Sequence, residues 1–211
     1  MLFGGNSDSL AEEILRSSSF LRELRSGQLT QRCYNNFIQQ EALYLHRVSS
    51  TLETLMCSLQ EADENTRSLL LDTLKHYRSR NQSLFISPPP QWLHFALQSF
   101  HYVVLEEPVY WLVALSARAC LRDFLAREQL FSELKPGSTL VSGSEVKAGS
   151  IYQQWSEESL KEVAWTRKYR KVIGEYQDQM DVFKAINIFR QHMMNQKSFY
   201  KAVTCDVEDN E

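Results

Sequence analysis

The chain has 211 residues, of which 43% are hydrophobic and 23% are charged, and its formal net charge is −3. These values are typical of one globular domain that buries a core. The basic residues are scattered along the chain, which argues against a nucleic-acid partner. The apolar run at residues 108–117 is about half the roughly 20 residues that a membrane span needs, so no membrane partner is expected either.

Helical signals dominate the chain, and strand signals are nearly absent. Capping residues, glycines and prolines divide the sequence into segments. Helices are predicted over residues 9–24, 30–59, 62–80, 92–105, 108–128, 156–173 and 177–203. We expect Gly174 to break or kink the chain between the last two helices, and residues 131–150 to form a loop. The predicted fold is all-α, a single-domain bundle of about seven helices over residues 1–205, followed by an acidic tail at 206–211.

Four cysteines are spaced far apart and form no CxxC pair, so the sequence indicates neither a zinc site nor a redox motif. We expect free thiols and a cytoplasmic protein, because thiols stay reduced in the cytosol. The five histidines form no E-x-x-H or H-x-x-x-H pair. No metal ion or other cofactor is therefore predicted.

The second predicted helix carries a carboxylate on its apolar face. Reading every third or fourth residue gives the row Tyr34, Ile38, Glu41, Leu45, Val48, Leu52, Leu55 and Leu59. Such a row is typical of the inward face of an amphipathic helix. A buried carboxylate persists only if it is paired, protonated or used in a site. Glu41 is therefore the first candidate site residue.

Two further apolar helices each contain a polar residue. Arg118 interrupts the helix that begins at Pro108, and Gln196 interrupts the apolar row of the last helix. Inward polar groups from facing helices can build a ligand site in a bundle. They can equally form a structural ion-pair network, with Arg118 neutralising Glu41. The residues alone leave both interpretations open.

Residues 27–45 resemble a signature of the TenA/thiaminase-2 family. The residues at matching spacings are Gly27, Leu29, Tyr34, Phe37, Gln40, Glu41, Tyr44 and Leu45. Glu41 stands where the family has Asp. Weaker similarity continues at Pro108-Val109, at Trp155-Ser-Glu-Glu and at Gln196-x-x-Phe199-Tyr200.

The resemblance implies a haem-oxygenase-like fold and hydrolysis of thiamine or of its aminopyrimidine breakdown products. It implies that Glu41 and Tyr44 orient the pyrimidine, and that the last helix supplies the acid/base. It also implies oligomers. The substrate-binding residues expected from it are Gln40, Glu41, Tyr44, Arg118, Trp155 and Phe199.

Two departures from the family pattern concern the chemistry. Gln196 stands where the family has a glutamate, and an amide cannot transfer protons as a carboxylate does. Alignment on Pro108 places Arg118 at the family's reactive position, whereas a shift of two residues would place Cys120 there as the nucleophile. We favour Arg118 inside and Cys120 in packing, because positions i and i+2 of a helix face different sides.

The predicted catalytic set is accordingly Glu41, Tyr44, Gln196 and Cys120. Two functions stay open. One is a thiamine-salvage hydrolase of the TenA/thiaminase-2 type. The other is a catalytically impaired relative that binds a small heteroaromatic ligand or a protein partner without turnover.

Overall fold

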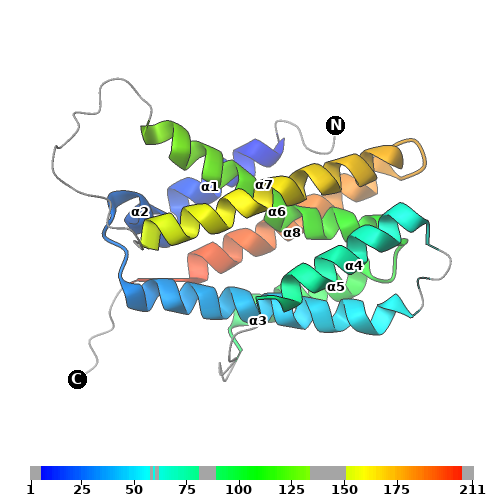
Figure 1. Cartoon of the computed structure of the whole chain (residues 1–211), viewed down its shortest axis with the longest axis horizontal. Coiled ribbons are helices and arrows are strands. Elements are labelled where there is room, and N and C mark those ends of the chain that lie inside the picture. The colour runs from blue at the N-terminus through cyan, green and yellow to red at the C-terminus, as the bar shows by residue number, and fades with distance from the viewer. Residues whose placement is uncertain (1–5, 58, 60–61, 81–88, 134–150, 206–211) are drawn as a thin grey trace.

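The computed structural model describes residues 6–57, 59, 62–80, 89–133 and 151–205, and within these ranges it contains helices and no strand. The predicted all-α bundle is confirmed. The described helices are α1 (Asn6–Ser17), α2 (Ser19–Ser26), α3 (Gln31–Met56), α4 (Glu64–Arg78), α5 (Gln91–Val103), α6 (Pro108–Glu133), α7 (Ile151–Glu175) and α8 (Val182–Ala202). Figure 1 shows their arrangement.

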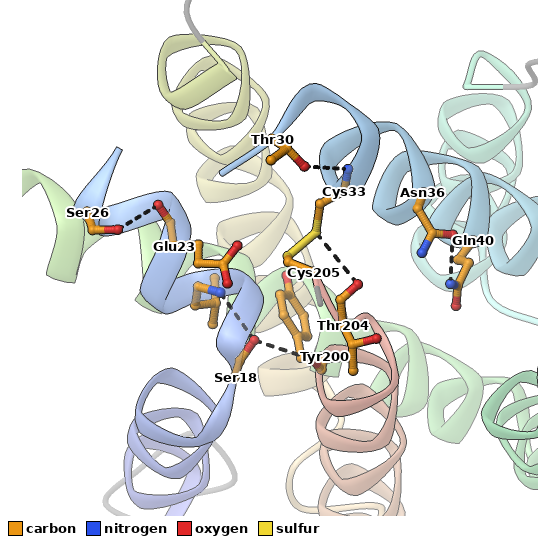
Figure 2. The surroundings of a disulfide bond; sticks show 11 residues. Ser18, Glu23, Ser26, Thr30, Cys33, Asn36, Gln40, Tyr200, Thr204 and Cys205 are labelled. Carbon is orange, nitrogen blue, oxygen red and sulfur yellow. Dashed lines mark hydrogen bonds between the residues drawn. A yellow bond between two sulfur atoms is a disulfide. The ribbon is translucent and has the colours of Figure 1, made fainter. Parts of the chain in front are cut away.

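The segment predicted as one helix over residues 9–24 forms two helices, α1 and α2. The described bundle therefore has one helix more than the seven predicted. Ser18 has an extended backbone with ψ of 119°, and its Oγ accepts a hydrogen bond from the backbone N–H of Leu21 at 3.2 Å. A serine with this geometry caps a new helix. The same Oγ donates to the backbone carbonyl of Tyr200 at 3.3 Å, which joins the break to α8 (Figure 2). α2 then ends at Gly27, whose φ of 72° is the left-handed conformation that glycine adopts without strain.

Several predicted helix starts agree with the structure to within a few residues, because side-chain caps mark them. Thr30 accepts from the N–H of Cys33 at 3.2 Å, and Asp63 accepts from that of Thr66 at 3.0 Å. Asp181 caps α8, which begins five residues later than predicted. These hydroxyl and carboxylate caps satisfy N–H groups that the first turn leaves free.

Two helices extend beyond their predicted bounds. α7 begins at Ile151 and continues through Gly174 to Glu175, so Gly174 does not break the helix. A glycine inside a helix costs about 1 kcal/mol relative to alanine, which the packing of a 25-residue helix can offset. α6 also extends to Glu133, into the predicted loop. The rest of that loop, residues 134–150, and the acidic tail at 206–211 lie outside the described residues.

α6 is the central helix of the bundle. From Val109 to Ala126, every residue except Phe124 is buried. α6 packs most extensively against α7 and α8, and it also touches α1, α4 and α5 (Figure 1). A helix that is apolar nearly all round belongs in the middle of a fold. The polar residues between Val109 and Ala126 are therefore held in the interior.

The expectation of four free thiols is wrong for two of them. Cys33, at the start of α3, forms a disulfide with Cys205, just after α8, across 172 positions of sequence (Figure 2). Cys57 and Cys120 are free. Sequence spacing could not reveal this pair, because the fold brings the two chain segments together. Among the described residues, no helix combines the length and apolar character that a membrane span requires.

Candidate functional site

Glu41 lies on the buried face of α3, where the apolar row predicts it. Its exposed fraction is 3%, and the flanking row members Tyr34, Leu45 and Val48 are buried as well. Ile38, which lies between Tyr34 and Glu41 in the same row, is only half-buried. The Glu41 carboxylate itself is almost fully removed from water. It must be stabilised by groups from other helices.

Arg118 from α6 supplies the first of these groups. Its Nη2 lies 3.2 Å from Glu41 Oε1, while its Nη1 donates to Glu162 Oε1 on α7 at 2.8 Å. The expected pairing of Arg118 with Glu41 is thus confirmed. One guanidinium links two buried carboxylates from two helices, so α3, α6 and α7 are joined by charge at the centre of the bundle.

The pairing decides the ionisation of these carboxylates. Burial alone would raise the pKa of Glu41, but the adjacent arginines outweigh it and lower this pKa to about 2. Burial is likewise outweighed for Glu162, whose pKa is lowered chiefly by Arg118. Both carboxylates are therefore charged at neutral pH, and neither carries a proton to donate as a general acid.

Two more arginines approach the same carboxylate. Arg80, which follows α4, donates from Nη1 to Glu41 Oε1 at 3.3 Å. Arg122 on α6 places its Nη2 3.7 Å from the same oxygen. The Arg122 guanidinium also lies 4.7 Å above the Trp155 ring, a cation–π contact worth about 2 kcal/mol when desolvated. Its three nitrogens have no hydrogen-bond acceptor among the described residues, so the Glu41 charge and the aromatic face of Trp155 stabilise this cation without a hydrogen bond.

The sequence reasoning missed three of these charged residues, although two carried a usable signal. Arg122 lies four positions after Arg118 on the same apolar helix, so both share one face. Glu162 belongs to the buried row Trp155, Ser159, Glu162, Thr166 and Tyr169 on α7. That row has the spacing that drew attention to Glu41. Arg80 had no such signal, because it lies beyond the end of a helix.

A cavity of about 600 Å³ opens beside Glu41, between α3, α4 and α7. α3 contributes Tyr34, Ile38, Glu41 and Leu45 to its wall, which are one face of that helix. Across from them, the wall includes His76, Arg80, Gln154, Glu158 and Lys161. This volume lies in the range of small-molecule sites, and the wall combines apolar area with charged groups.

His76 contributes an imidazole ring to this wall. Its Nε2 lies 3.3 Å from Glu162 Oε1, and its ring stacks on Trp165 with centroids 4.5 Å apart. A carboxylate that accepts from one imidazole nitrogen fixes the tautomer and leaves the other nitrogen available for proton transfer. His76 was not among the predicted site residues.

The predicted substrate-binding residues are divided by the structure. Glu41 lies on the cavity wall. The other five predicted residues are not among the described residues that line it: Gln40, Tyr44, Arg118, Trp155 and Phe199. Gln40 accepts a hydrogen bond from Trp92 Nε1 at 2.7 Å and donates to Asn36 at 3.0 Å, as Figure 2 shows for the second bond. These contacts hold α3 to α5 and engage both ends of the Gln40 amide.

The aromatic residues of that set lie in the core. Burial raises the pKa of Tyr44 to about 12, so its phenol keeps its proton at neutral pH. Phe199 packs 4.9 Å from Phe37, centroid to centroid, and Trp155 is fully buried beneath Arg122. The ligand-contacting roles of these residues stay predictions.

Two of the predicted catalytic residues, Gln196 and Cys120, lie apart from the ion pairs of Glu41. Gln196 is buried on α8, and within the described chain it forms no hydrogen bond to Glu41 or Arg118. Burial raises the pKa of the Cys120 thiol to about 12, and the charged groups that act on it are Arg170, Asp123 and Arg127 rather than Glu41. A thiol in this environment is a poor nucleophile at neutral pH.

The part of the chain that the structure describes contains no group of three or more His, Cys, Asp or Glu residues placed to hold a metal ion. The centre formed by Glu41, Arg118, Arg122 and Glu162 contains two negative and two positive charges, and its carboxylates are also contacted by Arg80 and His76. Comparison of the chain with known protein-family models and with curated protein sequences gave no match. The resemblance to TenA/thiaminase-2 proteins stays a prediction from the residue pattern at positions 27–45.

Proposed function

We propose that this protein binds a small heteroaromatic molecule bearing an amine or amidine group, of the aminopyrimidine class, in the cavity beside Glu41. One observation carries the proposal: a carboxylate that is 3% exposed and held ionised lies on the wall of a cavity of about 600 Å³. A buried carboxylate is a strong acceptor for ligand N–H groups, because charge-assisted hydrogen bonds strengthen away from water. The TenA-like pattern around Glu41 points to the same ligand class.

The proposal is a binding function first, because the expected proton chemistry lacks support. Gln196 cannot act as a general acid, and the raised pKa of Cys120 leaves its thiol protonated. Glu41 stays ionised across the physiological pH range, so it orients a ligand rather than shuttling a proton. This combination fits the impaired relative of a TenA-like hydrolase.

Binding is tested by thermal unfolding and calorimetry with thiamine and 4-aminopyrimidine as probes. A ligand at 100 times its Kd should stabilise the folded protein by about 2.7 kcal/mol. Ile38→Trp places an indole in the cavity and should abolish this stabilisation. Gln39→Trp, on the exposed side of the same helix, is the matched control and should bind as the wild type does. Absence of stabilisation by either probe at saturation would overturn the proposal.

Hydrolysis of the same ligands is the second candidate, and the His76–Glu162 pair favours it. His76 lies on the cavity wall with its Nε2 held at 3.3 Å by a carboxylate, as a general base requires. If hydrolysis occurs, His76→Gln should lower kcat by about 10²- to 10⁴-fold, the usual contribution of a general base. His94→Gln, at an exposed position on α5, should leave it unchanged. Release of ammonia or of the thiazole is the readout.

The remaining expectations stay predictions. A cytoplasmic location is not supported by the Cys33–Cys205 disulfide, since oxidising compartments preserve such bonds better than the cytosol does. The resemblance implies a homo-oligomer, and light scattering would test this by measuring the molecular mass in solution. The charge of the chain gives no support to a nucleic-acid partner.

A further inference from the structure

Arg80 lies on the cavity wall between two carboxylates that come from different helices. Its Nη1 donates to Glu41 on α3 at 3.3 Å, and its Nη2 forms an ion pair with Glu158 on α7. The two ends of one guanidinium therefore face two acceptors. A planar cation with two N–H groups in a similar spacing has the same complementarity.

The deeper charges are balanced without Arg80. Glu41 and Glu162 carry two negative charges, and Arg118 and Arg122 carry two positive ones. The Arg118 and Arg122 side chains are 3% and 1% exposed, respectively. The Arg80 side chain is 17% exposed, so water reaches this third arginine where it does not reach the other two.

Arg80 is also held less firmly by its backbone. α4 ends at Arg78, and the N–H of Arg80 bonds to the carbonyl of Tyr77 at 3.3 Å in the turn that follows. Its other partner, Glu158, is 31% exposed and keeps an ion pair with Lys161 at 3.0 Å. If Arg80 swings out, Glu158 is still neutralised by Lys161, and Glu41 by Arg118 and Arg122. The movement leaves no buried charge without a counter-charge.

We propose that Glu41 and Glu158 form a cation subsite for a guanidinium- or amidinium-shaped group, and that Arg80 occupies this subsite until such a ligand replaces it. This inference rests on the cavity of the proposed function and names the chemistry of one part of it. The ligand would place its two N–H groups where Nη1 and Nη2 of Arg80 now lie. Its remaining ring would extend along the apolar wall at Ile38 and Leu45.

An internal competitor lowers the apparent affinity, because only the fraction of molecules with an open subsite can bind. Removal of Arg80 eliminates that competition. The Arg80→Ala variant should therefore bind a cationic probe more tightly than the wild type, which is the reverse of the result for an arginine that contacts the ligand.

The test measures benzamidine binding to the full chain by calorimetry. We expect Arg80→Ala to bind benzamidine at least about tenfold more tightly than the wild type, which corresponds to an open fraction of a tenth or less. The matched control is Arg78→Ala. Arg78 lies two positions before Arg80, forms its ion pair with Glu53, and is not part of the cavity wall. It should bind as the wild type does. Equal or weaker binding by Arg80→Ala would overturn the inference.

A second variant tests the carboxylates and guards against misfolding of the first. Arg80→Gln keeps a polar side chain but removes the charge, and it should show a smaller gain in benzamidine affinity than Arg80→Ala. Combining Arg80→Ala with Glu158→Gln should remove most of the gain, because one of the two acceptors loses its charge. Retention of the full gain in the double variant would contradict the assigned subsite.

The two proposals fail separately. If 4-aminopyrimidine and thiamine do not bind but Arg80→Ala gains affinity for benzamidine, the ligand class of the proposed function is wrong and the subsite stands. If the wild type binds 4-aminopyrimidine and Arg80→Ala gains nothing, the cavity binds its ligand without displacing Arg80. A stronger response to benzoate than to benzamidine in the wild type would show instead that Arg80 attracts anions.

Discussion

The interior of this bundle contains two regions of opposite chemistry that share one helix. The charged centre consists of Glu41, Arg118, Arg122 and Glu162. The aromatic end consists of Phe20, Phe37, Phe199 and Tyr200 together with the Cys33–Cys205 disulfide. Phe37 and Glu41 are one turn apart on α3, and both are 3% exposed or less.

Burial has opposite effects on the contributions of the two regions to folding stability. Phe37 stacks on Phe20 at 4.3 Å, centroid to centroid, and such contacts stabilise the fold as they leave water. Charges lose hydration when buried, and their mutual attraction only partly offsets the loss. A bundle of this size could be held together by aromatic and aliphatic packing alone. Burial of these charges is therefore weak evidence for added stability.

The largest expected effect comes from breaking the charged centre. Arg118→Met removes the guanidinium that two buried carboxylates share, and it should lower the free energy of unfolding by about 3–5 kcal/mol. Arg127→Met is the control on the same helix, because its side chain is 52% exposed and its pair with Asp123 should contribute about 0.5 kcal/mol or less. Urea denaturation measures both. Equal losses in the two variants would contradict the distinction between the regions.

Acid should reduce the contribution of the charged centre to the free energy of unfolding and leave that of the aromatic end unchanged. The pKa of Glu41 is about 2 in the fold against an ordinary value of 4.5, so its contribution is fully present above pH 4.5 and is lost as the pH falls towards 2. The lost stability should be about 3 kcal/mol for Glu41, and Glu162 adds to it in the same direction. Unfolding free energies measured from pH 7 to 2 provide the readout. Phe20→Ala should lower the whole curve without changing its slope.

The disulfide provides the complementary experiment at the aromatic end. Replacing Cys33 and Cys205 together with serine should lower stability by about 2–4 kcal/mol, because the unfolded chain regains the freedom that a closed loop restricts. The free energy of unfolding of this double serine variant should depend on pH as that of the wild type does. Cys57→Ser, which changes an exposed free thiol, should have no effect. A changed acid slope in the double serine variant would show that the two regions are coupled.

The smallest effect concerns a neutral hydrogen bond near the charged centre. Thr73 Oγ and the Tyr169 hydroxyl lie 2.9 Å apart, and both side chains are buried. Thr73→Val leaves the phenol without this partner and should cost about 1–2 kcal/mol. Adding Tyr169→Phe should recover part of the loss, since no unpaired hydroxyl then remains. A further loss in the double variant would mean that the phenol has another important contact.

The sequence predicts helices and inward faces well, because a single helix determines them. The row through Glu41, the start of α3 after Thr30, and the central position of α6 follow from spacing and residue type. What spacing cannot predict is which helices face each other. Arg80 reaches Glu41 from beyond the end of α4, and Cys205 reaches Cys33 only through the tertiary fold.

Only part of the candidate site could be predicted, because spacing gives the inward residues of a helix but not the helices that they face. Arg118 and Glu41 were paired correctly from their inward faces, and Glu162 was accessible to the same argument. The cavity lies between α3, α4 and α7, whereas the family pattern directs attention to the second, central and last helices. His76 and Arg80 line it from α4 and its end, and neither was among the predicted site residues.

The Cys33–Cys205 bond makes most of the chain a covalent ring. The two cysteines are 172 positions apart, so α4, α5, α6 and α7, with nearly all of α3 and the whole of α8, lie within the closed part. A protease that cuts once anywhere inside the ring leaves a single molecule of unchanged mass apart from one added water. The nick is revealed only on reduction, when two fragments separate. A force applied to the end of the chain would likewise pass from Cys205 directly to Cys33, and the helices of the charged centre would not bear it.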